Sequence, residues 1–199
     1  QMVSSSRWFA GGDGTEDNPY IINSISQWQN LNNFAQAGED TYFKLAKNLN
    51  FNRQEIVPIS DFRGILDGDD HQIYNFVINS SAASVGIFES LTNAEISNLG
   101  ISSFEISAAS AEHVGALAAE ASNSTILFVY ADGGDISASG VIGGLIGSIS
   151  GTTISGSYAS VSISGQNSGF VGGFVGQATN SSNISQSYSG GNIVGLNNI

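Results

Sequence analysis

The feature that most constrains the fold is an internal repeat of nearly thirty residues. Four similar segments carry glycines at positions 86, 115, 143 and 172, so successive copies lie 29, 28 and 29 residues apart. Two sets of isoleucines keep nearly the same period: Ile96, Ile126, Ile154 and Ile184, and Ile106, Ile136, Ile163 and Ile193. Three sets of landmarks with one period indicate a repeat architecture in which each copy packs against its neighbours.

Each copy contains short runs in which apolar and polar residues alternate, such as Val161-Ser162-Ile163-Ser164. Alternation with period two is typical of a strand with one buried face, and the Gly, Asn and Ser between the runs mark turns. Three short strands per copy describe one coil of a β-helix. We therefore predict an all-β fold, a right-handed parallel β-helix of about six coils. A leucine-rich repeat, the main alternative, requires a denser Leu pattern than this chain has.

The N-terminal part carries a different pattern, which predicts a helical cap. A single helical stripe is formed by Trp28, Leu31, Phe34 and Ala35. Ser24 or Ser26 can cap its start, and Gly38 can end it. A solenoid exposes the end of its core, so a terminal element must cover that end. We expect this helix, with Trp8 and Phe9 nearby, to do so.

These patterns divide the chain into three parts. We predict a leader or tag remnant at 1–7, the cap and first strands at 8–50, and the coils of the β-helix at 51–199. No charged residue follows Asp135, and nothing guards the last strand as open strand edges are usually guarded. We therefore expect the coils to be truncated at the C-terminus, and we expect the exposed edge to self-associate end to end.

The charge of the chain argues against two classes of partner. Seventeen Asp and Glu residues against five Lys and Arg residues give a formal net charge of -12. Nucleic acids and anionic membrane surfaces recruit clusters of Lys and Arg, so neither is expected as a partner. No apolar run approaches the roughly 20 residues that span a bilayer, so no membrane insertion is expected.

No pattern in the sequence predicts an active site, a metal site or a cofactor site. His71 and His113 lack the His-Glu-x-x-His spacing of a zinc peptidase, the chain has no Cys, and no Gly-x-Ser-x-Gly elbow lies between a strand and a helix. Two acidic clusters are the nearest candidates for a calcium or polysaccharide-cleaving site. One contains Asp67, Asp69 and Asp70 beside His71 and Arg63, and the other contains Asp13, Glu16 and Asp17. Both lie in turns, where Asp is common for structural reasons.

An aromatic ladder is the candidate ligand-facing feature. Alignment of the copies places Tyr130, Tyr158 and Tyr188 at one position, which holds Val77 and Gly100 in the earlier coils. Because neighbours in a strand alternate faces, we expect the tyrosines to point outward and to stack. The same alignment matches 73–78 with 96–101 and puts Asn75 and Asn98 at one corner.

The chain resembles bacterial surface proteins that carry the GLUG motif, which is Gly, two apolar residues and Gly. Gly173-Phe174-Val175-Gly176 and Gly144-Leu145-Ile146-Gly147 match the motif, and Ala116-Leu117-Ala118-Ala119 and Ile87-Phe88-Glu89-Ser90 are degenerate copies. The opening is similar too, with Phe9-Ala10-Gly11-Gly12-Asp13-Gly14-Thr15, Asn18-Pro19-Tyr20 and Phe62-Arg63-Gly64-Ile65-Leu66-Asp67-Gly68. The resemblance implies large secreted proteins, often adhesin-like. Some relatives are parts of immunoglobulin-cleaving metallopeptidases, but no catalytic residue belongs to the repeat itself.

These observations lead to one preferred function and two alternatives. We expect a non-enzymatic adhesion or binding segment of a secreted or cell-surface bacterial protein, with a host or matrix glycan or protein as its partner. The alternatives are a carbohydrate-active β-helix enzyme, either a polysaccharide lyase or a hydrolase, and an inert structural stalk. For the tyrosine ladder, the alternative to ligand binding is that the stacked rings only stabilise the surface of the sheet.

Overall fold

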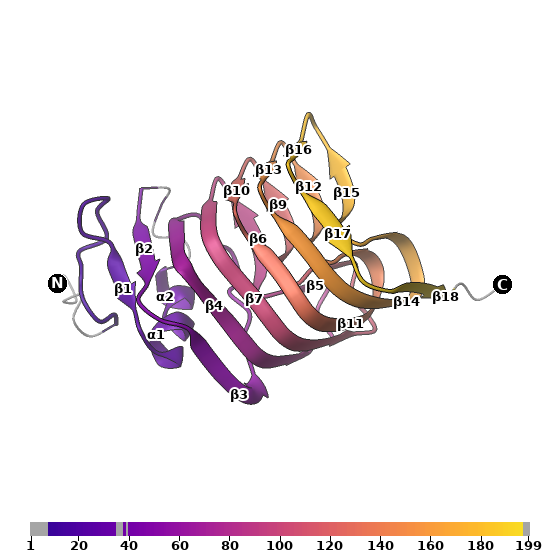
Figure 1. Cartoon of the computed structure of the whole chain (residues 1–199), viewed down its shortest axis with the longest axis horizontal. Helices are drawn as coiled ribbons and strands as arrows, with labels where there is room; N and C mark the ends of the chain where they lie inside the picture. Colours follow the sequence, from indigo (N-terminus) through magenta and orange to yellow (C-terminus); the bar gives the residue numbers. More distant parts are fainter. Residues whose placement is uncertain (1–7, 35–37, 39, 197–199) are drawn as a thin grey trace.

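The computed structural model describes residues 8–34, 38 and 40–196, and these residues form a parallel β-solenoid of about five turns (Figure 1). The predicted right-handed parallel β-helix with an N-terminal helical cap is thus confirmed. The predicted leader at 1–7 lies outside the described residues. Figure 1 shows the N-terminal strands and helices at one end of the solenoid and the last coil at the other.

Three groups of elements build the described part of the chain. The N-terminal group is β1 (Tyr20–Ile22), α1 (Ile25–Gln29), α2 (Leu31–Phe34), β2 (Tyr42–Leu45) and β3 (Leu49–Glu55). The large sheet continues through β4 (Ile65–Asn79), β5 (Ser84–Val85), β7 (Glu95–Ala108), β8 (His113–Val114), β10 (Thr125–Leu127), β11 (Tyr130–Gly143), β13 (Thr153–Ser155), β14 (Tyr158–Gly172), β16 (Asn183–Ser185), β17 (Tyr188–Gly190) and β18 (Ile193–Leu196). The small sheet contains β6 (Phe88–Thr92), β9 (Ala118–Ser122), β12 (Ile146–Ser150) and β15 (Val175–Thr179).

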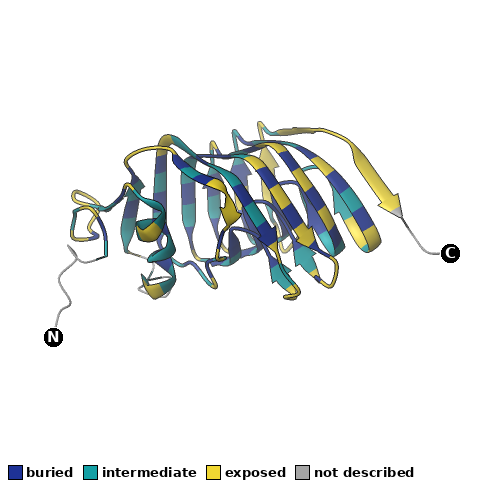
Figure 2. Ribbon diagram, turned by 90° about the horizontal axis from the view of Figure 1, so that it is seen from below, coloured by how far each residue is buried: buried dark blue, intermediate teal, exposed yellow. Residues whose placement is uncertain are grey.

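The repeat period of the sequence is the stacking period of the coils. Ile126 lies between Ile96 and Ile154 in the parallel ladder, and Ile136 lies between Ile106 and Ile163. Parallel neighbours lie about 4.8 Å apart, so equivalent residues form columns that run along the solenoid. Side chains of the inner columns fill the core, and Figure 2 shows the resulting alternation of buried and exposed residues along the strands.

The coils differ from the prediction in strand length and in number. β4, β7, β11 and β14 are single strands of 14 or 15 residues that bend at corners, where we expected short separate strands. Corner residues adopt positive φ, as Asn98 and Ser103 do at 52°, and this lets the strand turn without ending. The structure has about five turns where about six were predicted.

The predicted register of the first coil is wrong by five residues. Ile73 pairs with Ile101, whereas Ile96 pairs with Leu66. Asn75 therefore lies beside Ser103, and it does not share a corner with Asn98. Each coil has several corners, and an Asn with positive φ lies two residues after a buried isoleucine at both of these, Asn75 after Ile73 and Asn98 after Ile96. The two corners consequently look alike in sequence.

The glycines of the repeat allow the backbones to approach closely. A Cβ atom at Gly144 would collide with the carbonyl oxygen of Gly173 in the next coil, and one at Gly143 would collide with that of Ile146. A side chain is therefore excluded at this corner. The neighbouring Leu145 is fully buried and extends the core.

The helices cover the N-terminal edge of the small sheet. Of the two predicted candidates, Ser24 is the N-cap of α1, and its hydroxyl accepts a hydrogen bond from the Gln27 N–H. Trp28 is fully buried against Phe88 of β6, with the two ring centroids 5.8 Å apart. The Asn32 side chain donates to the Pro58 carbonyl and accepts from the Ser60 N–H. Ala35, the last residue of the predicted stripe, lies outside the described residues.

Candidate functional site

The tyrosine ladder exists as the repeat alignment predicts. Tyr130 of β11, Tyr158 of β14 and Tyr188 of β17 are register neighbours in three successive coils. The ring centroids of Tyr130 and Tyr158 are 5.2 Å apart with planes inclined by 7°, and those of Tyr158 and Tyr188 are 4.9 Å apart with planes inclined by 4°. The rings therefore form one offset stack along the solenoid.

The rings face outward because their neighbours in the strands face inward. Val129, Ala131, Ser157 and Ala159 are all buried. Tyr188 is 64% exposed, while Tyr130 and Tyr158 are partly buried by each other and by the adjacent coils. Burial raises the pKa of Tyr158, with smaller contributions from the nearby Asp132 carboxylate and the neighbouring tyrosines. At neutral pH its hydroxyl therefore stays protonated and can donate a hydrogen bond.

One of the two earlier ladder positions is corrected by the structure. Tyr130 pairs with Gly100, as predicted, but Gly100 pairs with Gln72, so the predicted Val77 does not belong to this column. This error follows from the five-residue register shift of the first coil. The Tyr130 ring lies over Gly100, where a Cβ atom would collide with it. The ladder therefore starts at Tyr130.

Buried hydroxyls fix the backbone beneath the ladder. The Val129 N–H donates to Ser157 Oγ at 3.0 Å, and this hydroxyl donates to the Ser155 carbonyl oxygen at 2.9 Å. Ser187 repeats the arrangement in the next coil, accepting from the Ser157 N–H at 3.3 Å. A second column of the same kind contains Ser124, Thr152 and Ser182. These hydroxyls satisfy backbone groups that the corners would otherwise leave unpaired in the core.

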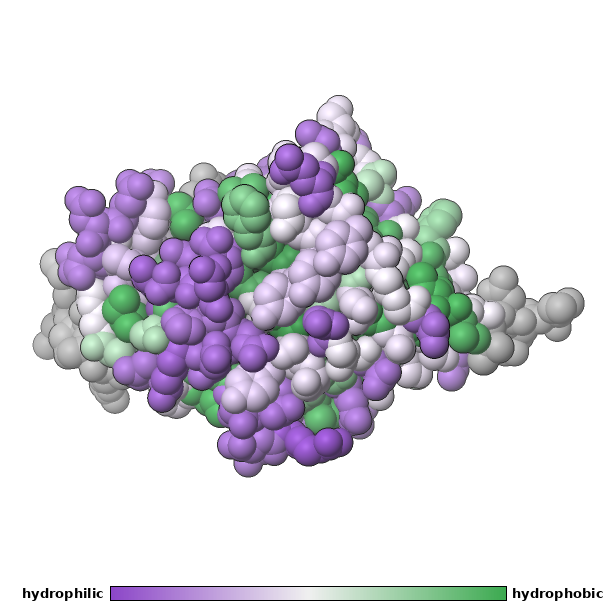
Figure 3. All heavy atoms as spheres, viewed as in Figure 1, coloured by the Kyte–Doolittle hydropathy of each residue, from purple (hydrophilic) through white to green (hydrophobic). Residues whose placement is uncertain are grey.

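A groove beside the ladder adds a residue that the sequence reasoning missed. The groove has a volume of about 240 Å³, and its walls include Phe128, Tyr130 and Tyr158, with Asn98 and Asp70 among the other lining residues. We call it the aromatic groove. Figure 3 shows a pale strip on this face with a hydrophobic patch beside it and a hydrophilic surface toward the N-terminal end.

Phe128 was missed because period-two alternation treats it as one more apolar strand residue. It is 60% exposed and lies at a corner with a φ of 54°. Neighbouring coils place Asn98, Gly156 and Gln186 in corresponding corner positions, all with positive φ. A large aromatic residue where other copies have turn-forming residues is the sequence signal that could have identified it.

The two predicted acidic clusters are explained by local structure. The Asp67 carboxylate accepts hydrogen bonds from the Asp69 N–H and from the Asn98 side chain, and Asp69 pairs with Lys44 at 3.5 Å. The Asp13 carboxylate accepts from the N–H and hydroxyl of Thr15. Within the described residues, no group of three or more His, Cys, Asp and Glu side chains is arranged to hold a metal ion.

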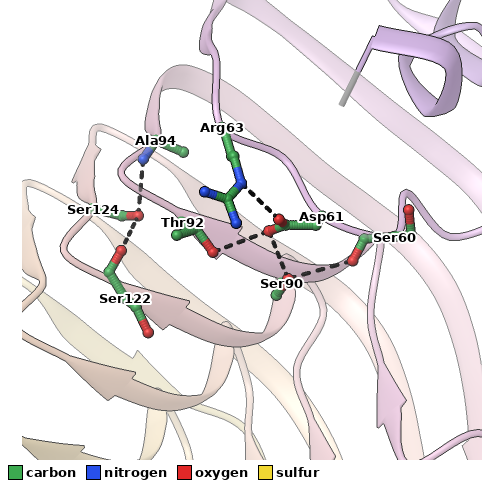
Figure 4. Close-up of polar contacts among 8 residues, drawn as sticks. All are labelled: Ser60, Asp61, Arg63, Ser90, Thr92, Ala94, Ser122 and Ser124. Carbon is green, nitrogen blue, oxygen red and sulfur yellow. Dashed lines mark hydrogen bonds and ion pairs between the residues drawn. The ribbon is translucent and has the colours of Figure 1, made fainter. Parts of the chain in front are cut away.

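An acid outside these clusters has a more developed set of contacts. Asp61 accepts hydrogen bonds from Arg63 Nε at 2.9 Å, Ser90 Oγ at 2.8 Å and Thr92 Oγ1 at 3.0 Å (Figure 4). Burial raises the pKa of this carboxyl, but the three hydrogen bonds outweigh burial and leave the pKa below its usual value. The cluster ties the loop before β4 to β6, which is a structural role.

Two further groups of side chains resemble parts of catalytic sites. Glu120 lies between Ser84, whose hydroxyl donates to it at 3.4 Å, and His113, whose Nδ1 is 3.6 Å away. In a catalytic triad the histidine must contact the serine, whereas here the acid does. Elsewhere Glu105 and Asp135 are register neighbours beside Arg53, and the Arg53–Glu105 ion pair measures 3.6 Å.

Comparison with known proteins supports the fold and gives two partial relatives. No family model matches the chain. Halomucin of Haloquadratum walsbyi is 38% identical over an alignment of 103 residues that covers 45% of this chain and 1% of halomucin. A candidate Gly-rich membrane protein of Evansella cellulosilytica is 31% identical over 91 residues, which cover 40% of this chain and 10% of that protein. The chain thus spans a small part of the length of these curated relatives.

A solved structure has the same architecture. The crystal structure of a candidate immunoglobulin A1 protease from Bacteroides ovatus matches 96% of this chain and 71% of its own, with a TM-score of 0.63 and 21% identity. At this identity the likeness concerns the fold alone. The fold and the ladder therefore define the class as a parallel β-solenoid with an outward-facing aromatic column. Among the described residues, no helix combines the length and the apolar character needed to cross a bilayer.

Proposed function

We propose that this chain is a non-enzymatic adhesion or binding segment of a secreted or cell-surface protein, and that the tyrosine ladder faces its ligand. The main support for this proposal is the column of three stacked, outward-facing tyrosines on a sheet whose backbone is held by buried hydroxyls. Such a surface is already ordered before binding, so little conformational entropy is lost when a ligand arrives. Aromatic side chains also contribute strongly to binding at interfaces.

The surface location rests on the partial relatives and on the sequence resemblance. The two relatives are halomucin and a Gly-rich membrane protein, and both names suggest a location at the cell surface. The two matches cover 45% and 40% of this chain. Membership in the GLUG-motif group of bacterial surface proteins belongs to the same proposal. A host or matrix glycan or protein is the ligand class that we infer.

A carbohydrate-active enzyme is the second candidate, and one arrangement favours it. Glu105 and Asp135 occupy adjacent coils, which are spaced by about 4.8 Å, and retaining glycosidases hold two carboxyl groups about 5–5.5 Å apart. Arg53, however, pairs with Glu105, and the two side chains are 79% and 59% exposed. The general acid of such an enzyme usually lies in a sheltered, apolar environment, so we rank this candidate second.

The proposal is tested by removing the central ring of the ladder. We expect Tyr158→Ala to lose most of its binding to a glycan array and to cultured host cells, because both stacking contacts disappear together with the middle of the aromatic surface. Tyr74→Ala is the matched control, since Tyr74 lies outside the ladder on β4 and is also partly exposed. Circular dichroism checks the fold of both variants. Unchanged binding by folded Tyr158→Ala would leave the ladder with a structural role only.

A further inference from the structure

We propose that the aromatic groove binds one neutral pyranose ring of a glycan and that Phe128 is its specificity-determining wall. This inference rests on the proposed function, since it names the ligand class for the same face of the solenoid. It is carried by three observations: the conformation of Phe128, the shape of the groove, and the charges around it.

Phe128 occupies a position that folding alone does not favour for a phenyl ring. Its φ of 54° lies in the left-handed region, which is costly for bulky side chains and is normally left to Gly, Asn or Asp. The corresponding corners of the neighbouring coils hold Asn98, Gly156 and Gln186. With 60% of Phe128 exposed, burial in the core gives little in return. Strained residues of this kind concentrate at binding sites, where a ligand contact explains their presence.

The groove has the size and lining of a subsite for one ring. Its volume of about 240 Å³ is below the roughly 300–1,000 Å³ of pockets that enclose drug-sized ligands. Phe128 contributes an apolar wall, and Tyr130 and Tyr158 contribute the other aromatic rings. The Tyr130 ring lies over Gly100 and the Phe128 ring lies over Gly156, so the two glycines let these rings lie close to the sheet on either side of the groove. The C–H groups of a pyranose ring suit such walls, while Asn98 and the tyrosine hydroxyls can bond its hydroxyl groups.

The charges select against acidic sugars. Asp70 lines the groove and no Lys, Arg or His does. Across the sequence, the basic residues are confined to Arg7, Lys44, Lys47, Arg53 and Arg63. The carboxylate of a uronic or sialic acid would therefore meet a like charge with no cation to compensate it. A neutral sugar has no such penalty, and its hydroxyls can donate to Asp70.

The stacking of the tyrosines also disfavours a cationic ligand. A cation is attracted to the face of an aromatic ring, whereas the ring edge is positive. Tyr158 is stacked on both faces, by Tyr130 at 7° and by Tyr188 at 4°. The edge and the hydroxyl of Tyr158 are what remain for a ligand. This arrangement suits oxygen-rich neutral molecules.

The test uses Phe128→Asn, which installs the residue found at the same corner of the preceding coil. Neutral gluco-, manno- and galacto-oligosaccharides are titrated into the whole chain and followed by the NMR amide signals of Gly100 and Gly156. We expect shifts of these two signals, binding at least tenfold weaker in Phe128→Asn, and a melting temperature equal to or above that of the parent chain. Phe170→Asn is the control, because Phe170 is 57% exposed, has no positive φ and lies outside the groove.

Several results would overturn the inference. One is that Phe128→Asn binds the neutral oligosaccharides as tightly as the parent chain. Another is that the parent chain prefers glucuronic acid or tetramethylammonium to the neutral sugars. The third is that no neutral oligosaccharide shifts the amide signals of Gly100 and Gly156. If Tyr158→Ala loses binding on the array while Phe128→Asn keeps it, the proposed function stands and the groove assignment falls. If neither variant loses binding, both fall.

Discussion

Small inward-facing hydroxyls have a large effect on how the coils of this protein stack. Ser157 lies in the core with 1% exposure, yet it is polar, because it accepts from the backbone of one coil and donates within its own. An alanine of similar volume could nearly fill the space but could not accept that hydrogen bond. The inner columns of serine and threonine are therefore part of the backbone hydrogen-bonding scheme.

We predict that Ser157→Ala lowers the free energy of unfolding by about 1–3 kcal/mol, because the buried Val129 N–H loses its acceptor. Urea unfolding followed by circular dichroism measures the change. Ser162→Ala is the control in the same strand, since Ser162 is exposed, and its effect should stay within about 0.5 kcal/mol. Equal effects of the two substitutions would contradict the role given to Ser157.

At the scale of elements, the N-terminal end is protected by irregular segments that replace strands. α1 and α2 pack against the small sheet, and the loop at 59–62 forms isolated bridges to β6 through Ile59 and Phe62. Asp61 holds this loop through its contacts with Arg63, Ser90 and Thr92 (Figure 4). An open strand edge would otherwise be available to other chains.

This arrangement predicts a pH-dependent contribution of Asp61 to stability. Its pKa is lower in the folded chain than the usual value of about 3.9, so the stabilisation is present above that value and is lost as the pH falls through the lowered pKa. We expect Asp61→Asn to be less stable than the parent chain at pH 7, by about 1–3 kcal/mol, with the difference shrinking below about pH 4.

Denaturant midpoints at neutral and acidic pH measure this difference. Asp17→Asn serves as the control, since Asp17 is exposed and the structure gives it no hydrogen bond or ion pair with other described residues. A difference between Asp61→Asn and the parent chain that stays constant from pH 7 to strongly acidic pH would contradict the assignment.

The elements also show which features the sequence can reveal. The repeat predicted the ladder, since Tyr130, Tyr158 and Tyr188 recur with the period of the buried isoleucines. The N-cap was narrowed to Ser24 or Ser26 because N-caps follow local rules, and the structure selects Ser24. The first coil was misaligned because two of its corners share one local pattern, and only pairing with the next coil distinguishes them. Phe128 was missed because period-two alternation treats it as one more apolar strand residue, although the other copies have Asn98, Gly156 and Gln186 at this corner.

At the scale of the whole molecule, the last described coil lacks the cover that the other coils have. Ile184 and Ile193 are 41% and 46% exposed, although their counterparts Ile154 and Ile163 in the preceding coil are buried. In Figure 2 the strand at the C-terminal end is exposed along its length. Exposed apolar residues on an unguarded strand favour association with another chain.

We therefore predict that the 199-residue chain associates at high concentration. Light scattering across a concentration series should show a rising mean mass, and Ile193→Lys should suppress the rise by placing a charge on the edge. Val57→Lys is the control, since Val57 is 60% exposed but lies near the N-terminal end. A strict monomer at millimolar concentration would count against this prediction.

We propose that the solenoid binds a ligand and does not cleave it. A glycan-array screen of the purified chain, run beside an assay for reducing sugar released from the glycans that it retains, separates binding from cleavage. We expect retention of glycans that depends on Tyr158, with no sugar released above the buffer control. Release of sugar by the parent chain, abolished in Glu105→Gln or Asp135→Asn, would instead establish the enzymatic alternative.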